Sequence, residues 1–365
     1  MALSILSVAT ALPHTRVTQK ESVQIAQNLA RTDEAEVLAS LYEGTTIATR
    51  HFALERDVVQ DMLQGTRHSE SVFLPSGEDN DPGPTTAQRM QHYVDHAGPL
   101  AVRAARQALV KSKLHPSAIT HLVTVSCTGF SAPGVDVELI KHLELPATVE
   151  RTHVGFMGCH GALNGLRVAR AFADADPGAC ILVCAVELCG SHYHYPWDPK
   201  KMVANALFAD GAAALVGVAV HAGPGSWQVT ASGSCIFANS ENAMTWNIGD
   251  HGFEMTLATK VPELIARNLR PWFDRWLARN GLSVADVASW AVHPGGPRIL
   301  TAVEQALGLD AQATAVSREV LAECGNMSSA TILFLIDGLR KRSAPLPCVA
   351  LGFGPGLTAE AALFQ

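Results

Sequence analysis

The sequence predicts an α/β layered fold built from two similar halves. Short apolar runs alternate with segments whose apolar residues recur every three or four positions, which is typical of strands alternating with amphipathic helices. The order of these segments also recurs, because each half contains a strand, a helix, a second helix and a strand followed by a glycine-containing segment. The halves therefore form an internal repeat of about 150 residues in pattern rather than in identity.

The expected elements follow one another along the chain. The apolar residues 1–6 predict an opening strand. The helix expected over 259–279 has apolar residues at i, i+3, i+4 spacing and ends at Asn280-Gly281, while Pro271 inside it predicts a kink or a division into two helices. The other strands are expected at 121–125, 181–185, 212–216, 290–292 and 349–351, and the other helices at 95–111, 159–174, 298–307 and 328–342.

Two irregular segments lie between these elements. The boundary between the halves is expected near 218–226, so that residues 1–220 form the N-terminal half and 221–365 the C-terminal half. Residues 67–86 are polar and contain several prolines and glycines, which predicts a surface loop.

Composition excludes several kinds of partner. The chain has 365 residues, of which 48% are hydrophobic and 17% charged, which suffices for a large core. Its formal net charge is −7 and no long basic block occurs, so we expect no nucleic-acid partner. No apolar run reaches the roughly 18 residues of a membrane span. The N-terminus lacks the features of a signal peptide, so a cytoplasmic location is expected.

The eight cysteines are expected to be free thiols. Several lie inside apolar runs such as 180–184, which favours buried thiols in a reducing compartment over a disulfide framework. The alternating His192 and His194 lack a third ligand at a diagnostic spacing, so a plain loop is expected there and no metal site.

Cys159 is the first candidate nucleophile. It lies in a glycine-rich segment, GFMGCHGALNG at 155–165, where a helix is expected to begin. A helix N-terminus and a nearby imidazolium favour the thiolate and lower a cysteine pKa, while Gly158 and Gly161 allow a substrate to approach closely. The alternative is a small core cysteine at a helix start. Cys127, at the end of another strand, is the second candidate.

Two distant segments supply possible partners. His293 ends an apolar strand before the PGGP turn and is placed to face a cleft, although a capped core histidine is the alternative. His160 adjoins Cys159, but successive helix residues diverge by about 100°, so we do not expect it to act as the base. Asn326 precedes a helix start, where it is either a cap or a neutral amide donor to an oxyanion or enolate.

These three residue types fit decarboxylative condensation of thioesters. The cysteine would hold an acyl chain, while the histidine and asparagine bind a second thioester carbonyl as carbon dioxide leaves, and the carbanion attacks the acyl-enzyme. A Cys/His/Asn peptidase uses the same residue types, but its local sequence signatures are absent.

Five segments resemble the chalcone and stilbene synthase family, the type III polyketide synthases. They are Gly158-Cys159, LFADGAAA at 207–214, HPGGP at 293–297, GNMSSA at 325–330 and GFGPGLT at 352–358. The resemblance implies a thiolase-like αβαβα layered fold of two similar halves and a homodimer. It also implies an acyl-CoA starter and malonyl-CoA extenders, with no bound cofactor.

The resemblance also implies roles for individual residues. Cys159 would be the acyl nucleophile, and His293 and Asn326 would promote decarboxylation and stabilise the enolate. Phe208 would be the gatekeeper between a coenzyme A tunnel and the cavity, which Ser328 would line. Coenzyme A would be bound by the turn after the histidine, at Gly295, Gly296 and Arg298.

Further cavity positions depart from those of plant chalcone synthases. Cys189 and His192 stand where the plant enzymes carry two threonines, and Met255 stands where they carry a second phenylalanine gate. Trp246 falls near a position that controls cavity size. Ala132 replaces a bulkier residue that reaches into the partner's cavity.

Two segments, 83–90 and 246–255, resemble the bacterial alkylpyrone and alkylresorcinol synthase branch, where fatty acyl starters are common. We therefore expect iterative condensation of malonyl-CoA onto a medium- or long-chain acyl-CoA, followed by closure to a pyrone or resorcinol-type ring. Ala132 and Met255 favour such a starter, whereas Trp246 argues against it. The alternatives are a ketoacyl-ACP synthase III and a catalytically inactive thiolase-fold scaffold.

Overall fold

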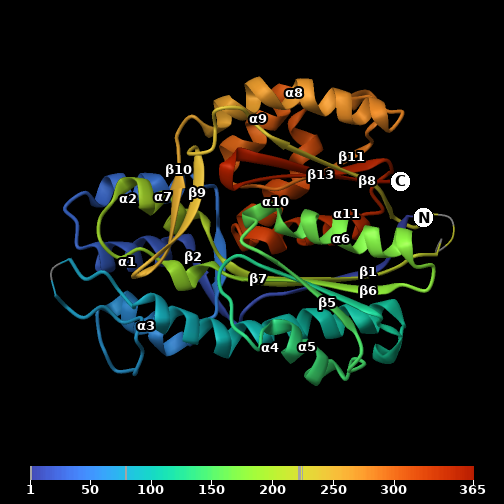
Figure 1. The fold of residues 1–365 in the computed structure, drawn as a ribbon. Coiled ribbons are helices and arrows are strands. Elements are labelled where there is room, and N and C mark those ends of the chain that lie inside the picture. The colour runs from blue at the N-terminus through green and yellow to red at the C-terminus, as the bar shows by residue number, and fades with distance from the viewer. Residues whose placement is uncertain (1, 79, 221–222, 224) are drawn as a thin grey trace.

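A nine-stranded mixed sheet forms the framework of the computed structural model, which describes residues 2–78, 80–220, 223 and 225–365 (Figure 1). In sheet order the strands are β11 (Ser289–Val292), β12 (Cys348–Gly354), β13 (Thr358–Phe364), β8 (Gln228–Ile236), β1 (Leu3–Ala11), β7 (Asp210–Val218), β6 (Cys180–Leu188), β4 (His121–Ser126) and β5 (Glu150–Gly155).

Helices divide this sheet into layers. Figure 1 shows α6 (Gly161–Ala175) and α11 (Thr331–Lys341) between the two parts of the sheet, with α8 (Val261–Arg279) and α9 (Pro297–Leu307) on one outer face and α4 (Thr86–Ser112) and α5 (Val135–Leu143) on the other. The order is helix, sheet, helix, sheet, helix, which confirms the expected αβαβα fold. The two parts of the sheet join where β8 pairs with the start of β1.

The central helix layer is packed tightly because small residues let the elements approach. One hydrophobic core contains buried side chains of α6, α11 and strands from both parts of the sheet. Within it, a Cβ added to Gly165 of α6 would lie 2.9 Å from Cγ2 of Val125, closer than real contacts allow. Helix α6 therefore packs directly on β4, and this packing fixes the turn that precedes the helix.

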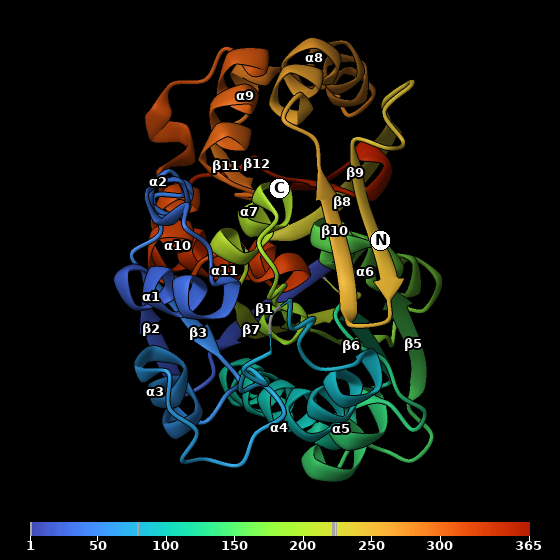
Figure 2. The same cartoon turned by 90° about the vertical axis from the view of Figure 1, so that its left-hand side faces the viewer.

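A second group of elements lies to one side of the sheet, on the left of Figure 1 and facing the viewer in Figure 2. Two short pairs of strands contribute to it, β2–β3 and β9–β10. The group comprises β2 (Thr15–Thr18), α1 (Gln19–Ala30), α2 (Ala35–Glu43), β3 (Thr49–Phe52), α3 (Arg56–Gln64), α7 (Pro199–Leu207), β9 (Met244–Gly249) and β10 (Gly252–Leu257). Helix α10 (Ala315–Cys324) packs against α11 and β3.

The expected elements are present, with two differences. Helix α4 begins at Thr86, earlier than expected, because Thr85 and Gln88 form a capping box there. Residues 66–78 and 80–85 form no helix or strand, as expected for the loop. Helix α8 is a single helix that contains Pro271, so the division into two helices is wrong. The boundary between the halves falls on residues 221, 222 and 224, which lie outside the described residues, and it stays a prediction.

Replacing Gly165 with valine should destabilise the protein by about 1–3 kcal/mol, because the added methyl groups would enter the space of Val125 and Val183. The midpoint of urea unfolding measures this effect. The control is Gly98→Ala in α4, where the new methyl group meets the flexible side chain of Glu138 and stability should change by no more than about 1 kcal/mol. Equal midpoints for the wild-type and Gly165→Val proteins would contradict the packing argument.

Candidate active site

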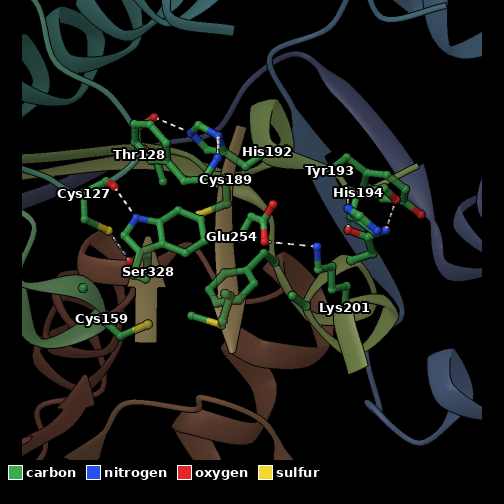
Figure 3. A pocket seen from close by; sticks show the side chains of 18 of the residues that line it. Cys127, Thr128, Cys159, Cys189, His192, Tyr193, His194, Lys201, Glu254 and Ser328 are labelled. Atoms are coloured by element: carbon green, nitrogen blue, oxygen red, sulfur yellow. Dashed lines mark hydrogen bonds and ion pairs between the residues drawn. The ribbon is translucent and has the colours of Figure 1, made fainter. Parts of the chain in front are cut away.

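A pocket lies where the carboxyl ends of several strands meet (Figure 3). Strands β4, β5 and β6 are parallel, so the segments that follow them come to the same edge of the sheet. These segments carry three cysteines of the pocket wall, Cys127, Cys159 and Cys189, and the opposite wall is formed by residues of α7, β9 and β10.

The position of Cys159 depends on the glycine before it. Gly158 has a φ of 68°, and an added Cβ would lie 2.4 Å from Cδ of Pro355, which follows β12. Only glycine fits both the left-handed backbone and this contact. Cys159 then lies in a short 3₁₀ turn, and α6 begins at Gly161.

The thiol of Cys159 is buried and close to Asn326. Its Sγ lies 4.0 Å from Oδ1 of Asn326. Burial raises the pKa of Cys159 to about 12. The expectation that the helix start lowers this pKa is therefore wrong, because desolvation is the largest influence on the thiol. Burial and the carboxylate of Glu187 raise the pKa of Cys127 well above its usual range.

Hydrogen bonds of both its backbone and its side chain hold Asn326 in place. Its N–H donates to the carbonyl of Leu207 and its carbonyl accepts from the N–H of Ala209, both at 2.9 Å. Its side-chain Oδ1 accepts a hydrogen bond of 2.9 Å from the N–H of Ser328. The side chain therefore caps the following turn through its oxygen, and the amide nitrogen is the group left to donate elsewhere.

His293 directly follows β11, which is parallel to β12. Its N–H donates to the carbonyl of Leu351, and its ring is buried. Among the described residues neither ring nitrogen has a hydrogen-bond partner. Burial, with a smaller contribution from His160, lowers the pKa of His293 to about 3, so the imidazole is neutral. His160 itself pairs with Asn164 in the next turn of the helix.

Six residues expected at the cavity do line this pocket. They are Cys189, His192, Phe208, Trp246, Met255 and Ser328. The pocket-lining residues among those described do not include Ala132, His293, Gly295, Gly296 or Arg298, and Ala132 and Arg298 are exposed. The roles expected for these residues stay predictions.

Two of the wall side chains are locked by hydrogen bonds. The N–H of Phe253 donates to Nδ1 of His192 at 2.9 Å, so the proton is on Nε2, which donates to the carbonyl of Thr128 at 2.6 Å. The indole Nε1 of Trp246 donates to the carbonyl of Cys127 at 2.7 Å. His192 and Trp246 thus hold fixed orientations in the wall.

The sequence analysis missed a buried carboxylate beside two of the thiols. Glu187, near the end of β6, accepts hydrogen bonds from the N–H of Cys127 at 3.0 Å, from Oγ1 of Thr128 at 2.7 Å and from Oγ of Ser329. Burial raises its pKa. A single acidic residue within the apolar run 180–188 was the signal that could have revealed it.

Two buried arginines were also missed. Arg50 donates to the carbonyl of Phe208 at 2.9 Å, and Arg89 donates to the carbonyls of Pro84 at 2.8 Å and Tyr193 at 3.0 Å. Both guanidinium groups therefore hold the loops that form the pocket wall. Two of these three carbonyls, those of Phe208 and Tyr193, are more than 100 residues away in the sequence, so no local pattern indicates these contacts.

No group of three or more possible metal ligands occurs within the described residues. A search of the same residues finds no helix that is long and apolar enough to cross a membrane.

The raised pKa of Cys159 predicts how its reactivity depends on pH. Because the pKa is about 12, the thiolate fraction and the rate of alkylation by iodoacetamide should keep rising from pH 7 to pH 10. Mass spectrometry of the Cys159 peptide over time measures this rate, with the partly exposed Cys235 as an internal comparison. A plateau that begins below pH 7 would contradict the prediction.

Comparisons with known proteins give the family. Residues 2–224 match the N-terminal domain of chalcone and stilbene synthases, and residues 228–365 match their C-terminal domain. An "alpha-pyrone synthesis polyketide synthase-like Pks18" of Mycobacterium tuberculosis is 32% identical over 371 residues, which cover 99% of this chain and 90% of that protein. A "probable polyketide synthase 1" of Dictyostelium discoideum is 30% identical over 98% of this chain but only 11% of its own length.

Solved structures agree with this result. PKS-I of the brown alga Ectocarpus siliculosus has a TM-score of 0.92 and 32% identity, covering 100% of this chain and 99% of its own. The C-terminal type III polyketide synthase domain of Steely1 from Dictyostelium has a TM-score of 0.89 and 29% identity, with the same coverage. The chain therefore belongs to the chalcone and stilbene synthase family of type III polyketide synthases, acyltransferases that carry out decarboxylative condensation.

Proposed function

We propose that this enzyme condenses malonyl-CoA iteratively onto a medium- or long-chain acyl-CoA and closes the product to a pyrone or resorcinol-type ring. The contact of the Cys159 thiol, which lines the pocket, with Asn326 is the observation that carries this proposal. The name of the mycobacterial relative, which includes alpha-pyrone synthesis, supports a pyrone as the product.

We further propose that Cys159 is the acyl nucleophile. The thiol would lose its proton to the neutral imidazole of His293 and attack the acyl-CoA carbonyl, and the proton would pass to the departing coenzyme A thiolate. Both groups are buried and neutral, so this transfer would create a thiolate–imidazolium ion pair, which would be consumed when the thiolate attacks and the proton passes to coenzyme A.

In the second half-reaction, malonyl-CoA would lose carbon dioxide and leave an enolate. Asn326 would donate from its amide nitrogen to the enolate oxygen, and His293 would donate from its ring. The carbanion would then attack the thioester on Cys159, forming a carbon–carbon bond and releasing the thiolate. The fixed backbone of Asn326 supports this role, because a preorganised donor needs little reorganisation during the reaction.

An adjoining apolar chamber supports an alkyl starter. Phe52, Gly190 and Tyr193 line both this chamber and the main pocket. Its remaining walls are almost entirely apolar and include Ile25, Leu29, Val59, Met62 and Phe73. A hydrocarbon chain loses contact with water in such a chamber, which favours its binding by about 0.8 kcal/mol for each buried methylene.

We also propose a homodimer. Strand β5 is at the edge of the sheet, with only β4 beside it among the described strands. Nearby aromatic and apolar side chains are exposed, namely Phe130 (54%), Phe156 (37%) and Met157 (45%). An open edge and an exposed apolar surface are typical of an interface between subunits. The free cysteines of the described chain support a reducing, cytoplasmic location.

Mass spectrometry of products from malonyl-CoA and a panel of starter acyl-CoAs tests the proposed function. Medium- and long-chain starters should give pyrones or resorcinols, and Cys159→Ala should abolish them because the acyl chain has no attachment point. Asn326→Ala should lower kcat by about 100-fold or more, through loss of the enolate donor. Exclusive use of aromatic or short starters would contradict the lipid starter.

Narrowing the apolar chamber should change the choice of starter. Met62→Trp is expected to lower kcat/KM for the longest accepted acyl-CoA by about tenfold, while short starters are spared, because the indole would occupy the space of several methylenes. Val110→Trp, on the exposed face of α4, is the matched control. The same loss for every chain length would show that the chamber does not hold the starter.

A further inference from the structure

Lys201 is the only lysine or arginine among the described residues that line the catalytic pocket. It belongs to the first turn of α7, and its Nζ lies 3.1 Å from Oε2 of Glu254 on β10. Figure 3 shows this ion pair on the other side of the pocket from Cys159. The side chains are 28% and 50% exposed, so the pair lies at the mouth of the pocket rather than in its interior.

The ion pair can open at small cost. Partly exposed ion pairs contribute little to stability, because water and salt screen them. No backbone hydrogen bond of α7 or β10 depends on the Lys201 ammonium group. The pocket can therefore exchange the Glu254 carboxylate for another anion without rearrangement of its walls.

The coenzyme A thioester substrates carry such anions, and the negative net charge of the protein repels them. Coenzyme A thioesters carry several phosphate charges, and the formal net charge of the chain is −7. Two histidines share the mouth with Lys201, but burial lowers the pKa of His194 to about 4 and leaves it neutral, and Nδ1 of His251 is in a hydrogen bond to the carbonyl of Gly83. Lys201 is therefore the principal cation that an entering substrate meets in the pocket wall.

We propose that Lys201 binds a phosphate group of the coenzyme A thioester, and that this phosphate replaces the Glu254 carboxylate as the partner of Lys201. The inference rests on the acyl-CoA and malonyl-CoA substrates of the proposed function. Phosphate is favoured over the malonyl carboxylate because that carboxylate must lie beside the reacting thioester, at the Cys159 side of the pocket. The phosphates are at the opposite end of the pantetheine arm from the thioester, and Lys201 is on the opposite side of the pocket from Cys159.

Opposite effects of two substitutions distinguish this role from a structural ion pair. Lys201→Ala should raise the dissociation constant of coenzyme A by about fivefold, whereas Glu254→Gln should lower it, because a competing anion is removed. Lys200→Ala is the matched control, since Lys200 is exposed and does not line the pocket. Isothermal titration with coenzyme A alone measures all three. Weakening of equal size in Lys201→Ala and Glu254→Gln would overturn the proposal.

Phosphate-free probes identify the anion. Pantetheine should bind the wild-type and Lys201→Ala proteins equally, and malonyl-N-acetylcysteamine, which keeps the carboxylate, should show the same KM in both. A KM for malonyl-N-acetylcysteamine that rises in Lys201→Ala would assign the carboxylate instead and overturn the phosphate assignment. Because titration with coenzyme A needs no turnover, a wild-type protein that binds it but forms no polyketide would refute the proposed function and leave this test valid.

Discussion

A short backbone bridge between the two parts of the chain organises the catalytic pocket. The N–H and carbonyl of Asn326 pair with the carbonyl of Leu207 and the N–H of Ala209, which joins the loop after α10 to the loop after α7. This pairing places Asn326 beside Phe208. The guanidinium of Arg50 donates to the carbonyl of Phe208. A change in this bridge would therefore move Asn326 and Phe208 together.

The pocket combines rigid polar walls with neutral reacting groups. Buried polar side chains are costly unless each is satisfied, and here Trp246, His192 and Glu187 all have partners within hydrogen-bond distance. Burial keeps the thiol of Cys159 and the imidazole of His293 uncharged. Under the proposed mechanism, charge would develop on these two groups during the reaction.

The sequence predicted the parts of this site that have local patterns. The strand before His293 and the helix after Cys159 follow from apolar periodicity, and the glycines around Cys159 reflect a close backbone approach that the contact of Gly158 with Pro355 explains. The contacts of Arg50 with Phe208 and of Arg89 with Tyr193 could not be predicted, because only the tertiary fold brings these residues together. The pKa of Cys159 was expected to fall because a helix start does not reveal how deeply the thiol is buried.

The indole of Trp246 affects the access of water to the pocket as well as the size of the pocket. Its N–H is in a hydrogen bond to the carbonyl of Cys127, close to the thiols. A smaller side chain would leave that carbonyl without its donor and open space beside it, conditions under which a water molecule is readily held. Water in that place would compete with the carbanion for the acyl thioester and release the chain as a free acid. Under the proposed function, the tryptophan would thus protect an acyl chain on Cys159 from hydrolysis.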